Sequence, residues 1–321
     1  MLDVRRLRLL RELAHRKTIA AVAAALSYTP SAVSQQLTAL ERETGVVLLE
    51  RSGRRVELTP AARTLVEHAE IVFAALARAE ADLAAGRTEL AGQLRIGAFP
   101  SAVPRIVSPA LVALSREHPK LELMVAEADP ATVPQALRAE TLDVALVQEY
   151  DYVPAACDPA LDSEPLLEET VYLAATTSGG LAARDDAAWI AGTPGTLCHT
   201  VTIRACEAAG FTPRIRHHAD DFGTVLALVA AGQGVALVPE LGATAAPAGV
   251  VFTALPARRR TSIAYRRGTG AAPAVVAVCA ALRAALGDGP PLRTRGGDAN
   301  STHEMCVDKG MFASPPRVYF E

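Results

Sequence analysis

The chain has 321 residues, half of them hydrophobic and a fifth charged, with a net charge of −3 at neutral pH. That length exceeds what one ordinary hydrophobic core holds, so we expect two or more domains. No stretch approaches the roughly 20 uncharged apolar residues of a membrane span, which argues against a membrane protein. The Arg-rich start lacks the apolar core of a signal peptide, which argues against a secreted protein. We therefore expect a cytoplasmic protein. The five cysteines show no framework spacing, which argues against a disulfide-stapled domain.

Charge is distributed unevenly along the chain. Residues 1–65 carry eleven Arg or Lys against six Asp or Glu, a net +5, whereas the remainder carries 21 against 29, a net −8. A basic head on an acidic body indicates a polyanionic partner, such as double-stranded DNA, for the head alone.

The first 45 residues predict three helices. The first helix ends near His15, and Thr18 caps a second one, which runs over residues 19–26. Pro30 begins the third helix, because proline is tolerated just inside a helix start, and Gly45 ends it as a left-handed cap. Two helices joined by so short a turn form a helix-turn-helix, whose second helix enters the major groove of DNA.

The third predicted helix separates apolar and polar residues onto two faces. Val33, Leu37 and Leu40 recur at spacings of four and three and are expected to point inward. The predicted DNA-contacting residues begin this helix or lie on its other face: Thr29, Pro30, Ser31, Ser34, Gln35 and Thr38. Gln can bond an adenine edge through two hydrogen bonds. The alternative interpretation of this face is a polar surface that only meets solvent.

Residues 48–59 predict a β-hairpin that turns at Ser52-Gly53. Arg51, Arg54 and Arg55 would lie near its tip and straddle the DNA backbone or the minor groove, where arginine acts as a counter-charge. The hairpin is therefore predicted to be a DNA-binding wing.

In their order and spacing these motifs resemble the winged helix-turn-helix of the LysR-type transcriptional regulators. The matching elements are the Ala-rich second helix, Thr29 to Leu37, Leu40-Glu41, Gly45, Leu48, Arg51, Arg54-Arg55-Val56 and Leu58-Thr59. The chain departs from the family at Leu49, where Phe is usual, and at Ala62, where Gly is usual. The resemblance implies a ligand-responsive, DNA-binding regulator that forms homodimers or homotetramers and recruits RNA polymerase.

The pattern from Thr59-Pro60 to about residue 86 is helical without a break. Its apolar residues recur at alternating intervals of four and three, which is typical of a coiled-coil seam: Leu65, Ala69, Val72, Leu76, Ala79 and Leu83. Such a narrow seam favours pairing with a second copy of the chain, and packing on the chain's own domain is the alternative. Two heads on one coil imply an inverted-repeat DNA site.

Strands and helices alternate after Gly92, which predicts an α/β body. Strands are expected at 94–97, 121–127, 143–147, 171–175, 235–239 and 261–266, and helices at 103–118, 133–140, 200–210, 221–232 and 271–286. The first strands and helices predict a parallel α/β unit, and two crossings would join two lobes around a cleft. The resemblance implies the same, because the family's effector domains are similar to periplasmic binding proteins.

The predicted fold class is thus α/β, with an all-α winged helix-turn-helix in front. The expected divisions are this DNA-binding domain at 1–58, a dimerisation linker helix at 59–91, a two-lobed effector domain at 92–287 and a disordered tail at 288–321. The lobes would cover about 92–167 with 267–287, and about 168–266.

Ligands of α/β sheets lie at the carboxyl ends of strands and at the starts of the following helices. This rule predicts a set of ligand-binding residues: Ser101, Ala102, Thr132, Gln148, Thr196, Thr200 and Phe222. Ser101 would cap a helix whose free N–H groups favour a carboxylate, so the sequence predicts a small anionic metabolite. Plain capping and packing are the alternative roles for these residues.

Two further functions stay open. Cys198 and Cys206 lie in the same region as the redox pair of peroxide-sensing relatives, although eight residues of helix would separate the sulfurs by roughly 12 Å, beyond disulfide reach. A sequence-indifferent architectural DNA-binding protein is the other alternative. Adjacent His217 and His218 would point to opposite sides of an extended segment, so we expect no metal site. No nucleophile and base are paired, so we expect neither an enzyme nor a cofactor besides the effector.

Overall fold

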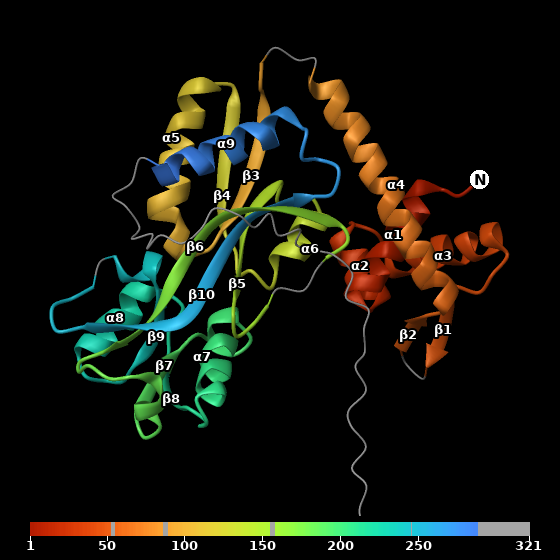
Figure 1. Ribbon diagram of the computed structural model, residues 1–321. Helices are drawn as coiled ribbons and strands as arrows, with labels where there is room; N and C mark the ends of the chain where they lie inside the picture. The colour runs from red at the N-terminus through yellow and green to blue at the C-terminus, as the bar shows by residue number, and fades with distance from the viewer. Residues whose placement is uncertain (53–54, 86–88, 155–157, 245, 288–321) are drawn as a thin grey trace, which may run out of the picture.

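The computed structural model describes residues 1–52, 55–85, 89–154, 158–244 and 246–287. The predicted tail at 288–321 lies outside the described residues. Figure 1 shows a small helical head, a long helix and a larger α/β body. Within the described ranges, no helix combines the length and the apolarity that crossing a membrane requires.

The head consists of three helices and one hairpin, as the sequence predicts. Its elements are α1 (Val4–Arg16), α2 (Ile19–Ala25), α3 (Pro30–Thr44), β1 (Leu49–Ser52) and β2 (Arg55–Leu58). Thr18 caps α2 and Thr29 caps α3, each accepting a backbone N–H through its side chain. Gly45 ends α3 at a φ of 70°, a left-handed conformation that favours glycine. The predicted caps Thr18 and Gly45 are confirmed, and Thr29 caps the helix that Pro30 was predicted to begin.

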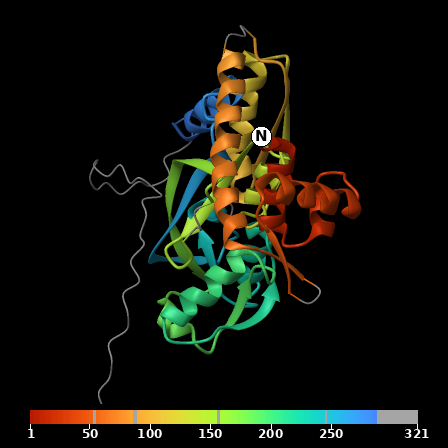
Figure 2. The ribbon, with the colours of Figure 1, turned by 90° about the vertical axis from the view of Figure 1, so that its right-hand side faces the viewer.

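The long helix α4 (Pro60–Ala85) connects the head to the body. At its start, Ala62 and Ala69 are buried in the hydrophobic core of the head. Farther along, Ala74 and Ala81 are buried where α4 lies beside the body (Figure 2). Gly268 permits the close approach, because a Cβ there would lie 2.2 Å from the Ala74 carbonyl oxygen. The helix is therefore held at both ends.

The body is built on one mixed six-stranded sheet in the order β4-β3-β5-β10-β6-β9. Its strands are β3 (Gly92–Ala98), β4 (Leu121–Glu127), β5 (Val144–Tyr150), β6 (Leu161–Ala175), β9 (Ala236–Pro239) and β10 (Val251–Arg266). β3 is parallel to β4 and β5, and the other pairings are antiparallel. The parallel unit predicted from the first strands is thus confirmed for β3, β4 and β5, whereas β6 and β10 run in opposite directions through both lobes.

Helices and a second, two-stranded sheet complete two lobes (Figure 1). The remaining elements are α5 (Ser108–Glu117), α6 (Val133–Arg138), β7 (Ala188–Ala191), α7 (Leu197–Ala208), β8 (Arg214–His218), α8 (Phe222–Ala230) and α9 (Pro273–Gly287), with short turns η1 (Pro100–Ala102), η2 (Val103–Val107), η3 (Leu181–Arg184) and η4 (Glu240–Ala243). Lobe 1 contains β3–β5, α5, α6 and α9, and lobe 2 contains β7–β9, α7 and α8. The sequence did not predict β7 or β8.

The predicted helix at 103–118 begins irregularly. A three-residue 3-10 turn precedes it, and residues 103–107 form a π-helical segment in which the Ser108 N–H bonds to the Val103 carbonyl. Pro104 and Pro109 lack backbone N–H donors, so the regular α-helical ladder cannot form over these positions.

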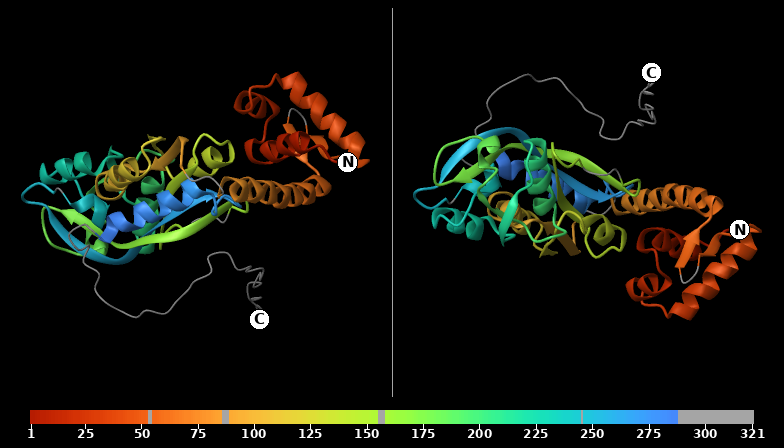
Figure 3. Two further views of the ribbon diagram at one scale, coloured as in Figure 1. Left: turned by 90° about the horizontal axis from the view of Figure 1, so that it is seen from above. Right: turned by 90° about the horizontal axis from the view of Figure 1, so that it is seen from below.

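The head and lobe 1 also meet through charged side chains. Glu140 follows α6 at a φ of 60° and pairs with both Arg8 of α1, at 3.3 Å, and Arg266 of β10, at 3.2 Å. Figure 3 shows the head at one end of the molecule and lobe 2 toward the other. Lobe 1 is thus the part of the body that contacts the head.

Candidate DNA interface and effector cavity

The predicted DNA-contacting face of α3 is open to solvent. All six residues predicted from the first turn and outer face of α3 are exposed: Thr29, Pro30, Ser31, Ser34, Gln35 and Thr38. Val33, Leu37 and Leu40, by contrast, are buried in the core of the head. The amphipathic pattern therefore leaves the polar face free to meet base edges.

Two side chains hold α3 against its neighbours. Arg6 of α1 donates from Nε to Oε1 of Gln36, at 2.9 Å, and forms an ion pair with Glu43. Oε1 of Glu41 accepts the backbone N–H groups of Leu48 at 2.9 Å and Leu49 at 3.1 Å. Glu41 thereby anchors the start of the hairpin to the recognition helix, a role that the sequence did not predict.

The wing is confirmed as an antiparallel hairpin in its backbone. Leu49 pairs with Leu58 and Ser52 with Arg55. Arg54, with Gly53, lies outside the described residues, and so do the side chains of Arg51 and Arg55. Phosphate contacts by the three arginines stay a prediction.

The coiled-coil seam of α4 divides into two parts. Leu65 and Ala69 pack into the head's own core, which removes Ala69 from any surface available to a partner. The later members are exposed, with Leu76 at 46% and Leu83 at 82% of their full accessible area. We call Val72, Leu76, Ala79 and Leu83 the exposed seam.

A cavity of about 190 Å³ lies between the two lobes. Thirteen described residues line this interlobe cavity: Phe99, Pro100, Ser101, Glu127, Ala128, Asp129, Pro130, Gln148, Thr196, Cys198, Asp220, Phe222 and Arg259. The carboxyl ends of β3, β4 and β5 supply the lobe 1 wall, as the strand-end rule predicts.

Four of the seven predicted ligand-binding residues line this cavity: Ser101, Gln148, Thr196 and Phe222. Ala102 does not, because it packs in the core of lobe 1. The Thr132 hydroxyl donates to the Asp129 carbonyl, and the Thr200 hydroxyl donates to the Thr196 carbonyl, so both are engaged with their own backbone.

Ser101 lines the cavity without capping a helix. Phe99 occupies the cap position and gives no side-chain hydrogen bond, while the Ser101 hydroxyl accepts from Nη1 and Nη2 of Arg259 at 3.3 and 3.4 Å. The helix-cap premise behind the predicted anionic ligand is therefore wrong.

Arg259 lies at the centre of the polar network behind the cavity. Its Nε donates to Glu169 Oε1 at 2.5 Å and its Nη1 to Gln148 Oε1 at 2.9 Å, and the guanidinium lies 4.9 Å from the centre of the Phe99 ring. The side chains of Arg259 and Glu169 are both 0% exposed. The second oxygen of Glu169 accepts the Leu241 N–H at 2.6 Å, which ties the turn η4 to the same pair.

The arginine run at 258–260 is the sequence feature that contains Arg259, although the run alone does not identify a buried ion pair with Glu169. A run of three arginines at 258–260 reads as a solvated surface, and only the β6–β10 register places Arg259 opposite Glu169 and Arg260 opposite Glu168. A buried ion pair offsets its desolvation only when its geometry is good, and the matched positions on β6 and β10 provide that geometry here.

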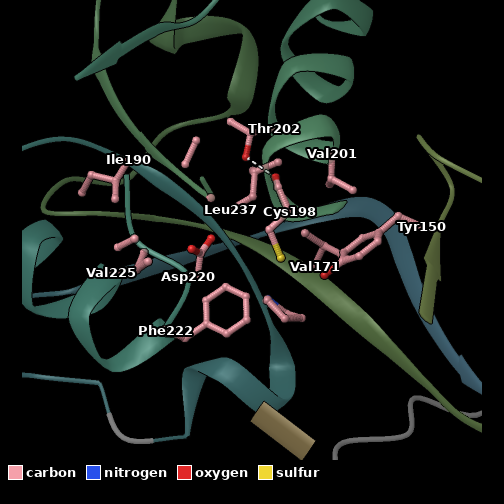
Figure 4. A pocket seen from close by; sticks show the side chains of 14 residues that line it. Tyr150, Val171, Ile190, Cys198, Val201, Thr202, Asp220, Phe222, Val225 and Leu237 are labelled. Atoms are coloured by element: carbon pink, nitrogen blue, oxygen red, sulfur yellow. Dashed lines mark hydrogen bonds between the residues drawn. The ribbon is translucent and has the colours of Figure 1, made fainter. Parts of the chain in front are cut away.

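An apolar recess extends from the cavity into lobe 2 (Figure 4). Its apolar lining includes Tyr150, Val171, Val201, Val225 and Leu237, and Cys198, Asp220 and Phe222 belong to both the recess and the cavity.

The two cysteines of α7 remain apart on an unbroken helix. The half-buried Cys198 turns its sulfur toward the side of the recess that holds Tyr150 and Val171 (Figure 4). Burial raises the pKa of the Cys198 thiol, and it raises the pKa of Cys206 to about 12.

Comparisons with known proteins identify the family. The model of the bacterial regulatory helix-turn-helix protein, lysR family, matches residues 4–63, and that of the LysR substrate binding domain matches residues 87–287. The chain belongs to the LysR family. It is a DNA-binding transcriptional regulator with an effector-binding domain, and the predicted family and fold class are confirmed.

Several relatives of this LysR-family regulator are similar over most of its length. The HTH-type transcriptional regulator TfdS of Cupriavidus pinatubonensis is 31% identical over 252 residues, covering 74% of this chain and 82% of the relative. A probable hydrogen peroxide-inducible genes activator of Mycobacterium avium is 30% identical over 272 residues, covering 80% and 86%. The OxyR C206 mutant structure from Corynebacterium glutamicum aligns with a TM-score of 0.53 at 26% identity, covering 89% and 92%.

We expect both α7 cysteines of this regulator to react slowly. Iodoacetamide should alkylate Cys198 and Cys206 far more slowly than free cysteine near neutral pH, because a raised pKa leaves little thiolate. Timed alkylation followed by peptide mass spectrometry measures the rates, with the denatured chain as the control. Rapid alkylation of folded Cys198, together with a peroxide-induced disulfide to Cys206, would contradict this expectation and favour the thiol-responsive alternative.

Proposed function

We propose that this LysR-family regulator binds an inverted-repeat promoter site as a homodimer or homotetramer and changes that binding when a small molecule fills the interlobe cavity. The observation that carries the proposal is the exposed polar face of α3, held by Arg6 on one side and by Glu41 beside the wing. Acting on promoters, the protein would work in the cytoplasm and influence RNA polymerase there. Its role would be regulatory rather than catalytic.

Footprinting on the DNA upstream of its own gene and the divergent neighbour tests this function. We expect two protected half-sites related by a two-fold axis, because paired heads read half-sites spaced by helical turns. Uniform protection that depends on salt and ignores sequence would instead support the architectural alternative.

Gln35→Ala should weaken binding to the cognate site about 5- to 150-fold, or about 1 to 3 kcal/mol, with little change on random DNA. Gln35 is exposed near the start of α3, where side chains reach base edges. Titrations of fluorescent duplexes measure both affinities. Gln135→Ala, an exposed glutamine on α6, is the control and should change neither. Equal losses on cognate and random DNA would remove Gln35 from base reading.

Glu41→Ala should weaken binding to every duplex, whereas Glu41→Gln should retain most of it. Alanine leaves the N–H groups of Leu48 and Leu49 without their acceptor, so the wing loses its fixed position, while the Gln amide oxygen can still accept. The same titrations on cognate and random duplexes measure the effect. If both variants bind like the unaltered protein, Glu41 does not position the wing.

The thiol-responsive alternative keeps one supporting observation, the position of Cys198 in the wall of the cavity. The relative from Mycobacterium avium is described as a hydrogen peroxide-inducible genes activator. The intact α7 and the raised thiol pKa values favour the metabolite-responsive function over it.

A further inference from the structure

We propose that the interlobe cavity takes a small organic cation, an amine with a compact apolar body, and not an anion. The proposal rests on the proposed function, because it assigns the chemical class of the effector to the cavity already described. It replaces the anionic ligand that the sequence predicted.

The charge of the cavity wall is negative. Three carboxylates line it, Glu127 and Asp129 from lobe 1 and Asp220 from lobe 2. Arg259 is the one basic side chain among the described lining residues, and Glu169 already neutralises it at 2.5 Å. A carboxylate ligand would face these like charges without a free cation, whereas an ammonium group would balance part of them.

The two aspartates are held in place for such a group. Oδ1 of Asp129 accepts the Ala131 N–H at 2.8 Å, which leaves Oδ2 for a ligand within the described part of the chain. Asp220 accepts the backbone N–H of Thr193 at 2.8 Å and its hydroxyl at 2.6 Å. The carboxylates are thus fixed on opposite lobes, where one bound cation would draw the lobes together.

The apolar part of the wall indicates the rest of the ligand. Phe99 and Phe222 line the cavity with Pro100 and Pro130. The guanidinium of Arg259 already covers Phe99, so Phe222 is the ring that can accept a cation or stack on an apolar body. Figure 4 shows Phe222 beside Asp220 at the recess. The volume of about 190 Å³ exceeds the roughly 150 Å³ of a cavity that binds benzene, so a ligand of about ten heavy atoms fits.

Three probes with one phenyl body separate the charge classes: phenethylamine, 3-phenylpropionate and zwitterionic phenylalanine. Thermal unfolding of the full chain, followed by the fluorescence of its one tryptophan, Trp189, measures their binding. We expect phenethylamine to raise the midpoint by about 2 to 4 °C when present well above its Kd, and 3-phenylpropionate to leave it unchanged. A smaller rise with phenylalanine would fit the same electrostatics.

Asp129→Asn and Asp220→Asn should each abolish the phenethylamine shift. The asparagine oxygen can still accept the N–H of Ala131 or of Thr193, and at position 220 the amide NH2 can donate to the Thr193 hydroxyl, so these variants remove charge with little loss of structure. Asp185→Asn, at an exposed carboxylate outside the cavity wall, should keep the full shift.

Three results would overturn the proposal: stabilisation by 3-phenylpropionate but not by phenethylamine, a phenethylamine shift that survives in both Asn variants, or no shift with any probe. Footprinting of the unaltered protein tests the proposed function separately. If it shows two protected half-sites while the probes give any of these three results, the DNA-binding function stands and only the cationic ligand is rejected.

Discussion

Arg259→Met should destabilise the body by about 3 to 5 kcal/mol. The substitution leaves the carboxylate of Glu169 buried without its cation and removes the donors to Gln148 and Ser101, and breaking a buried pair in this way costs that much. Denaturant unfolding monitored through Trp189 measures the loss, because this side chain is fully buried in lobe 2.

Arg260→Met is the matched control for this experiment. Arg260 belongs to the same arginine run but forms half-exposed pairs with Asp151 and Glu168, so its loss should cost about 0 to 1 kcal/mol. Replacing both members of the buried pair, as in Arg259→Met with Glu169→Leu, should recover part of the stability. If Arg259→Met proved no worse than Arg260→Met, the buried pair would not stabilise the body.

Leu76→Asp should convert the proposed dimer into monomers in sedimentation velocity and weaken operator binding by one order of magnitude or more. The exposed seam would have to bury a carboxylate, and separated heads lose the effective concentration that joined heads give one another. The fold should survive, because Leu76 is 46% exposed in the single chain. An unchanged midpoint of denaturant unfolding, followed by the fluorescence of Trp189, would show that the variant is folded.

Ile71→Asp controls for adding a charge to the same helix. Ile71 is 65% exposed but lies about 140° around α4 from Leu76, away from the exposed seam. The Ile71→Asp variant should therefore sediment like the unaltered protein. A Leu76→Asp protein that sediments as a dimer would place the interface elsewhere.

The head could be predicted from the sequence almost completely, because local interactions determine it. Thr18, Thr29 and Gly45 act within one helical turn, and the spacing of Val33, Leu37 and Leu40 already separates core from surface. Glu41 escaped prediction because its partners lie seven and eight residues away in the hairpin.

The cavity could be predicted only in part, because distant segments converge on it. Strand ends pointed to Ser101 and Gln148, but Arg259 reaches Ser101 from 158 residues away and takes the hydroxyl that a local cap would have used. The charged run at 258–260 also obscured the length of β10. The strands β7 and β8, of four and five residues, are too short for a periodic pattern.

The seating of α4 on Gly268 would make this helix a lever arm between the effector and the operator in the proposed function. From Ala74, at this seat, to Pro60 the helix spans about 21 Å, so a tilt of roughly 9° about the seat displaces the head by about 3 Å. That displacement is close to the 3.4 Å step between base pairs. In a two-armed assembly, a modest adjustment of lobe 1 is thus enough to change which half-site spacing the paired heads match.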